Sequence, residues 1–119
     1  MTLTAWELAN KKKNSMIKEI SGNEFEKEVK KSSIPAVVDF WAEWCTPCKM
    51  FAPAFEAVSK KLEGGIKFLK VNVDENNDLA SAEGVMSIPT IILYKNGDET
   101  GRFTGAKTER EFEEFLKKA

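Results

Sequence analysis

The chain of 119 residues has no histidine and only two cysteines. Because a tetrahedral structural zinc ion needs four cysteine or histidine ligands, these absences exclude such a site built from the chain alone. Long apolar runs are missing as well. No stretch is apolar and long enough to span a bilayer, and the N-terminus lacks the apolar segment of a secretory signal. We therefore expect a cytoplasmic protein with no membrane contact and no metal.

Neither sign of charge is in excess. The 18 basic and 19 acidic residues leave a formal net charge of -1, which provides no general attraction to nucleic acid or to acidic lipid surfaces. The length suits one domain, and a hydrophobic fraction of 42% is enough for a single core. Specificity must therefore come from a local site.

Both cysteines fall in one short motif, Cys45 and Cys48 within WCTPCK at 44–49. Two thiols separated by two residues can close into a disulfide, and so can store or deliver two electrons. A C-x-x-C pair in an intracellular βαβ context indicates redox chemistry. The alternative is an inert disulfide staple, which is disfavoured because so small a loop constrains the unfolded chain very little. In a reducing compartment, a close pair is more often catalytic than structural.

Hydrophobic patterning predicts an α/β fold. We expect residues 1–15 to form an extension, either a short helix or a mobile leader, ahead of a domain at 16–119. The predicted strands cover 36–41, 66–73, 90–95 and 98–104. The predicted helices cover about 22–31, the segment from the cysteines to Gly64, about 77–83, and a C-terminal helix capped by Thr108 and Glu111. The first two strands and the helix between them form a parallel βαβ unit, and Asn96-Gly97 predicts a type I′ hairpin.

The position of the thiols at the start of a helix suggests separate roles. Cys45 lies just before the predicted helix, where the helix dipole and free backbone N–H groups stabilise negative charge on sulfur. We therefore predict that Cys45 is the nucleophile, because only a thiolate attacks a disulfide. Cys48, within the first turn, should be more covered and act as the resolving thiol. Pro47 suits the first turn, where an N–H is not needed.

A carboxylate interrupts the buried strand AVVDFW at 36–41. Burial should raise the pKa of Asp39. We hypothesise that Asp39 is the general base for Cys48, directly or through a water, with Lys70 in the neighbouring strand as its partner. The alternative is a satisfied structural aspartate at a strand end. Trp41 is predicted to be in the core, whereas Trp44 is expected to shield the thiolate or to meet a partner.

In order and spacing, these residues resemble the thioredoxin family. The match runs from about Ser21 to the C-terminus. It comprises VDFWAEWCTPCK at 38–49, Pro53, Lys70 ahead of Asp74, IPT at 88–90, KNG at 95–97, and Gly105 with Ala106.

The resemblance implies a central mixed sheet with helices on both faces. It also implies a cis peptide before Pro89, whereas the residues alone favour trans because most X-Pro bonds are trans. The residues expected to contact substrate are Trp44, Thr46, Pro47, Ile88, Pro89 and Gly105. Further implications are a protein-disulfide reductase without a bound cofactor, disulfide-containing target proteins, a thioredoxin reductase as electron donor, and a monomer.

Two features depart from the family pattern. Thr46 stands where the commonest motif has glycine, and the extension at 1–15 has no family counterpart. An oxidase or isomerase is the alternative if Thr46 makes the disulfide more oxidising. A non-catalytic binding subunit of the same fold is a second alternative.

Overall fold

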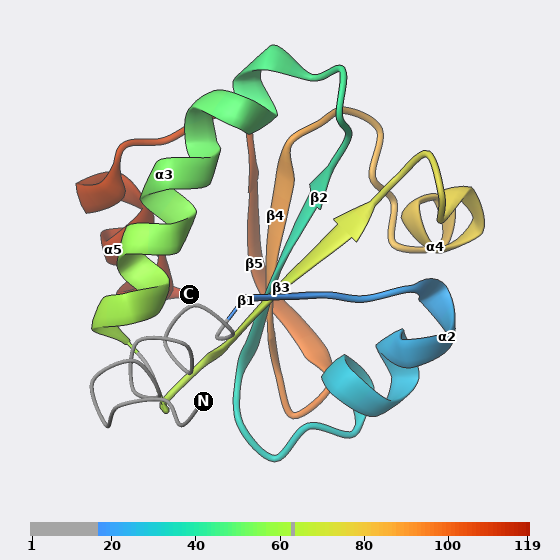
Figure 1. The fold of residues 1–119 in the computed structure, drawn as a ribbon. Helices are drawn as coiled ribbons and strands as arrows, with labels where there is room; N and C mark the ends of the chain where they lie inside the picture. The colour runs from blue at the N-terminus through green and yellow to red at the C-terminus, as the bar shows by residue number, and fades with distance from the viewer. Residues whose placement is uncertain (1–16, 63) are drawn as a thin grey trace, which may run out of the picture.

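A five-stranded mixed sheet lies at the centre of the molecule, in the order β1-β3-β2-β4-β5 (Figure 1). The computed structural model describes residues 17–62 and 64–119, so the short helix considered within 1–15 lies outside the described residues. The strands are β1 Ile17–Glu19, β2 Ala36–Trp41, β3 Lys67–Asn72, β4 Thr90–Lys95 and β5 Asp98–Thr104.

The central βαβ unit is confirmed. Helix α3, Thr46–Lys61, connects β2 to β3, and the two strands pair in parallel with Asp39 opposite Lys70. β2 is buried along almost its whole length, as expected for an apolar strand covered on both faces. The hairpin of β4 and β5 is also confirmed. Its turn has positive φ at Asn96 (54°) and Gly97 (83°), which a type I′ turn requires.

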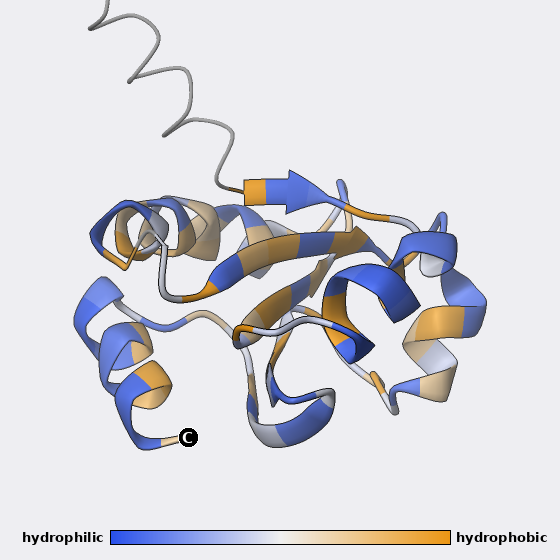
Figure 2. Ribbon diagram, turned by 90° about the horizontal axis from the view of Figure 1, so that it is seen from below, coloured by the Kyte–Doolittle hydropathy of each residue, from blue (hydrophilic) through white to orange (hydrophobic). Residues whose placement is uncertain are grey.

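Helices cover both faces of the sheet (Figure 1). One face carries α3 and α5, Glu109–Lys118, and the other carries α2, Gly22–Phe25, and α4, Asn77–Ala82. Hydrophobic residues are concentrated in the central strands in Figure 2. Aromatic rings fill the α3 face, where Phe112 lies 5.1 Å from Phe51 and 5.5 Å from Phe55 between ring centroids. Over the described residues, no helix has both the length and the apolar character needed to cross a bilayer.

Two details differ from the predicted elements. β1 was not expected, because a strand of three residues has too little alternation to stand out; it adds a parallel edge beside β3. The first helix is not one α-helix over 22–31. After α2 the chain forms a π-helical stretch, Glu26–Lys30, and the Lys31 N–H donates to the Glu26 carbonyl at 2.9 Å.

Replacing Gly97 tests the geometry of the hairpin turn. A Cβ at this position would lie 2.6 Å from the Lys30 carbonyl oxygen, and its φ of 83° disfavours other residues. We expect Gly97→Ala to lower the free energy of unfolding by about 2 kcal/mol or more, measured in urea.

Gly64→Ala is the matched control. Gly64 also has a positive φ, 89°, but among the described residues no atom beyond its chain neighbours lies within 4 Å of the space that a Cβ would occupy. Its loss should therefore be limited to the backbone cost, about 1 kcal/mol. Equal losses in the two variants would contradict the close approach at Gly97.

Candidate active site

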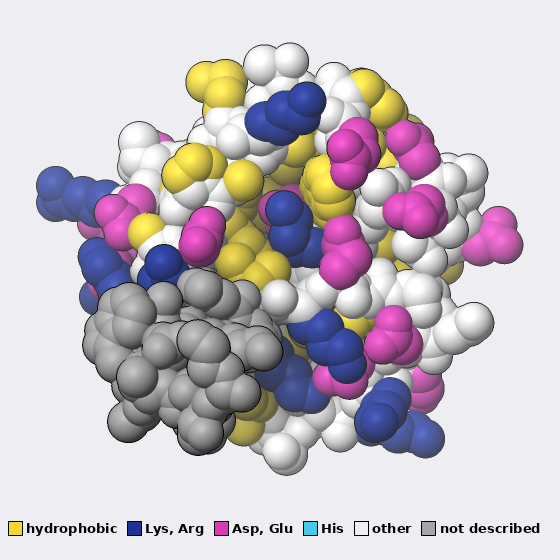
Figure 3. All heavy atoms as spheres, viewed as in Figure 1, with side chains coloured by type: hydrophobic (Ala, Val, Ile, Leu, Met, Phe, Trp, Pro, Cys, Tyr) yellow, Lys and Arg dark blue, Asp and Glu magenta, His cyan; other side chains and the backbone are white. Residues whose placement is uncertain are grey.

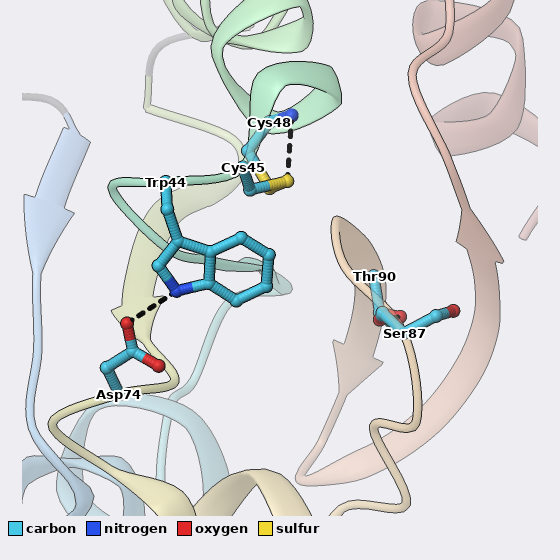
Figure 4. The surroundings of a disulfide bond; sticks show 6 residues. All are labelled: Trp44, Cys45, Cys48, Asp74, Ser87 and Thr90. Atoms are coloured by element: carbon cyan, nitrogen blue, oxygen red, sulfur yellow. Dashed lines mark hydrogen bonds between the residues drawn. A yellow bond between two sulfur atoms is a disulfide. The ribbon is translucent and has the colours of Figure 1, made fainter.

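The end of β2 leads directly to the two sulfur atoms (Figure 4). Cys45 is the N-cap of α3, and its N–H donates to the Ala42 carbonyl at 3.2 Å. Cys45 and Cys48 form a disulfide with their Cα atoms 5.3 Å apart. The central strand therefore positions the first cysteine, and the first helical turn positions the second.

The start of α3 surrounds Cys45 with positive polarity. The Cys45 sulfur accepts a hydrogen bond from the Cys48 N–H at 3.2 Å. This N–H belongs to the first turn of the helix, where backbone donors have no carbonyl partner within the helix. Together with the helix dipole, it favours a thiolate at Cys45 once the disulfide is reduced.

The expected difference in cover between the cysteines is absent. Both are 3% exposed in the disulfide form. The bond constrains the two sulfurs to lie side by side, and Ala42 and Ile88 pack against both cysteines as one cluster. The two sulfurs therefore differ in hydrogen bonding rather than in exposure, because the Cys48 N–H points toward the Cys45 sulfur.

Asp39 is buried without compensation. It is 1% exposed, and neither carboxylate oxygen has a hydrogen-bond partner among the described residues. Burial raises the pKa of Asp39 to about 7, with the Lys70 charge opposing the rise and the Glu19 charge adding to it. The described residues therefore do not provide the partners that a satisfied structural aspartate, the alternative, would have.

Three charged residues form a row across the sheet. Glu19 on β1 lies opposite Lys70 on β3, which in turn lies opposite Asp39 on β2. Within the described part of the chain, Lys70 forms no ion pair with Asp39; its Nζ lies 4.4 Å from the centre of the Trp41 ring. The Trp41 Nε1–H donates to Glu19 at 3.1 Å, and Trp41 is only partly buried. Sequence reasoning missed Glu19 because it missed β1.

A groove of about 480 Å³ opens beside the disulfide. It brings together two of the predicted substrate contacts, Trp44 and Ile88. Its other lining residues are Val73, Asn77, Ala80, Ser81, Val85, Met86 and Ser87. Trp44 is 68% exposed and Met86 is 97% exposed. In the space-filling view, hydrophobic side chains are exposed at the end of the molecule where α3 begins, with a basic side chain between them and acidic ones to one side (Figure 3).

Trp44 is oriented by a residue that the sequence did not indicate. Its Nε1–H donates to the Asp74 carboxylate at 2.8 Å (Figure 4). Asn72 at the end of β3 shapes this loop, because its side-chain oxygen accepts the Asp74 N–H at 2.9 Å. Only the position of Asp74 in the sequence could have indicated this contact, because Asp74 follows β3 and so lies at the same edge of the sheet as Trp44.

The remaining predicted contacts lie around the groove rather than in its lining. The Ile88–Pro89 peptide is cis, as the resemblance implied. Pro89 is buried, and its carbonyl accepts the Gly105 N–H at 2.9 Å. Thr46 and Pro47 are exposed in the first turn of α3. The Thr90 hydroxyl donates to the Ser87 carbonyl, which ties the start of β4 to the groove.

Comparison with known proteins gives a consistent result. The thioredoxin family model matches residues 16–118. A thioredoxin of Rickettsia bellii is 44% identical over 101 residues, covering 85% of this chain and 96% of that protein. Thioredoxin 1 of a Nostoc species is 40% identical over 100 residues, covering 84% and 94%. A thioredoxin of Pseudomonas aeruginosa is 42% identical over 92 residues, covering 77% and 85%.

The buried Asp39 makes stability depend on pH. Its pKa of about 7 lies above the ordinary 3.8, so the folded protein keeps a proton that the unfolded chain releases between these values. Stability should therefore fall as pH rises from about 4 to about 7 and then level off. Asp39→Asn should abolish this dependence and stabilise the oxidised protein above neutral pH by up to roughly 4 kcal/mol.

Denaturant unfolding of the oxidised protein across this pH range measures the effect. Asp98→Asn is the control, because Asp98 is exposed at the start of β5 and its replacement should leave the pH dependence unchanged. A variant at Asp39 with the same pH dependence as the parent would show that the carboxyl is not the titrating group.

Proposed function

Because the chain belongs to the thioredoxin family, its chemistry is thiol–disulfide exchange, and we propose that it reduces disulfides in target proteins with Cys45 as the attacking thiol. One observation carries this proposal. The Cys45 sulfur lies at the start of α3, accepts the Cys48 N–H, and belongs to a disulfide beside an exposed groove.

The reaction proceeds through a mixed disulfide. The Cys45 thiolate bonds to one target sulfur, and the other target sulfur leaves as a thiolate that takes a proton from water. Cys48 then loses its proton, and its sulfur attacks the Cys45 sulfur. The remaining target sulfur leaves as a second thiolate and is protonated. Two electrons have passed to the target, and the protein is left with the Cys45–Cys48 disulfide.

Asp39 accepts the proton of Cys48 in this scheme. A pKa of about 7 lets the carboxyl gain or lose a proton at neutral pH. Neither Asp39 oxygen has a hydrogen-bond partner among the described residues, so the carboxyl is free to take this proton, directly or through a water. Lys70 acts as a nearby charge that limits the rise of the Asp39 pKa.

The groove binds the polypeptide around the target disulfide. Trp44 and Ile88 supply apolar contact, and Pro89 with Gly105 supports the loop that carries Ile88. Thr46 and Pro47, exposed between the cysteines, face the docked target. Thr46 places a side chain next to the attacking sulfur, at the position where the commonest family motif has glycine.

The family implies disulfide-containing targets and a reductase partner that returns two electrons and two protons. We place this cycle in the cytoplasm, with a thioredoxin reductase as donor and the protein acting as a monomer. An oxidase or isomerase would use the same atoms. The equilibrium of the Cys45–Cys48 pair with glutathione distinguishes these functions, because the dithiol/disulfide pair of a reductase has a low reduction potential.

Replacing each cysteine tests the assigned roles. Cys48→Ser should form a stable mixed disulfide with a reducible target such as insulin, because no second thiol resolves it. Cys45→Ser should form no such adduct and should lose insulin reduction entirely. Mass spectrometry of the trapped species measures both outcomes. The assignment would be contradicted if Cys45→Ser formed an adduct on Cys48 as abundant as the adduct on Cys45 in Cys48→Ser.

We also propose that residues 16–119 form the functional domain, since the family match begins at 16. Removing residues 1–15 should leave insulin reduction within about threefold of the full chain, because the disulfide, the groove and Asp39 all lie outside that segment. A loss of several hundredfold, with unchanged folding by circular dichroism, would overturn this boundary.

A further inference from the structure

Edge strand β5 and the residue that follows it hold both ends of the segment that forms one wall of the groove. This wall, residues 83–89, connects α4 to β4 without regular structure and contributes Val85, Met86, Ser87 and Ile88 to the groove. At its far end, the Gly105 N–H donates to the Pro89 carbonyl at 2.9 Å. At its near end, the contact comes from Arg102.

Arg102 bonds the carbonyl groups of the two residues that follow α4. Its Nη2 donates to the Glu83 carbonyl at 2.8 Å, and its Nη1 donates to the Gly84 carbonyl at 3.2 Å. Carbonyl groups at a helix C-terminus have no partner within the helix, and a cation is favoured there. Arg102 therefore holds the C-terminal end of α4 from across the sheet edge.

Glu99, on the same strand, fixes the orientation of the guanidinium. Its carboxylate accepts the Arg102 Nε–H and an Nη2–H, each at 2.7 Å. The two residues are three apart on β5 and form an ion pair. The planar fork of arginine can serve a carboxylate and two carbonyls at once, which an ammonium group cannot do in the same geometry.

Other contacts also hold the wall between these two ties, among them the Thr90 hydroxyl, which donates to the Ser87 carbonyl. Met86 is 97% exposed. The Val85 N–H bonds to the Ala80 carbonyl at 2.9 Å, and the Tyr94 hydroxyl donates to the Glu83 carboxylate. Both of these contacts lie at the same end as Arg102, whereas the Ser87 and Ile88 contacts lie toward the other end. The part of the wall that carries Val85 and Met86 is therefore held mainly from the Arg102 end.

We propose that Arg102 is a positioning residue for target binding: by holding the Glu83 and Gly84 carbonyls, it fixes the groove wall opposite Trp44. This inference rests on the proposed reduction of protein disulfides. Arg102 touches neither sulfur, so it affects the docking of a polypeptide and not the exchange itself. Its effect should therefore be large for a protein target and small for a disulfide with nothing to place in the groove.

Steady-state kinetics of Arg102→Ala with insulin and with hydroxyethyl disulfide test this split. With insulin, we expect KM to rise about fivefold while kcat stays within about twofold, because docking weakens but chemistry does not. With the small disulfide, kcat/KM should stay within about twofold. Arg102→Lys should resemble Arg102→Ala, since it keeps the charge but loses the fork.

Arg110→Ala is the matched control. Arg110 is the other arginine of the chain, lies exposed on α5 and pairs with Glu114. Its replacement should leave all constants unchanged. The proposal would be overturned if Arg110→Ala raised the KM for insulin as much as Arg102→Ala does. It would also be overturned if Arg102→Ala lowered kcat/KM for hydroxyethyl disulfide as much as for insulin.

Hydrogen exchange provides a readout that needs no activity. In Arg102→Ala, the Val85 amide should exchange about tenfold faster, while the Val38 amide in the central strand keeps its rate. Unchanged Val85 exchange, or equal acceleration of Val38, would also overturn the proposal. If the parent protein failed to reduce insulin, the proposed function would fail, and this exchange experiment would still decide whether Arg102 holds the wall.

Discussion

The junction between β2 and α3 is the constraint on which the active site depends. Residues 42–45 connect a buried strand to a helix of 16 residues, and Cys45 is both the last residue of the connection and the helix cap. Because its sulfur accepts the Cys48 N–H, the two thiols and the first helical turn form one unit. A shift of α3 relative to β2 would separate the sulfur from the polarity that favours its thiolate.

The core on the α3 face keeps this junction in place. Phe51 and Phe55 of α3 pack against Phe112 of α5 and Phe68 of β3, and all four are at most 1% exposed. This packing also allows one uncompensated carboxyl, Asp39, to stay buried at a cost to stability. The site therefore combines a fixed sulfur, a titratable group near neutral pH and a groove, each held by a different part of the fold.

Much of this could be predicted from the sequence, because the informative residues act locally. The apolar run at 36–41, the helical spacing after Cys48 and the Asn96-Gly97 turn each specify their own element. β1 could not be predicted, since its three residues become a strand only through pairing with β3. The same holds for Glu19, Asp74 and Arg102. Their roles depend on partners 22, 30 and 18 or more residues away, and no local pattern indicates them.

The relative reactivity of the two thiols in the reduced protein tests the central claim most directly. Alkylation with limiting iodoacetamide at neutral pH, followed by peptide mass spectrometry, gives a rate for each cysteine. If the start of α3 favours the Cys45 thiolate, Cys45 should react at least about tenfold faster than Cys48. Equal rates, or faster modification of Cys48, would contradict this account of the active site.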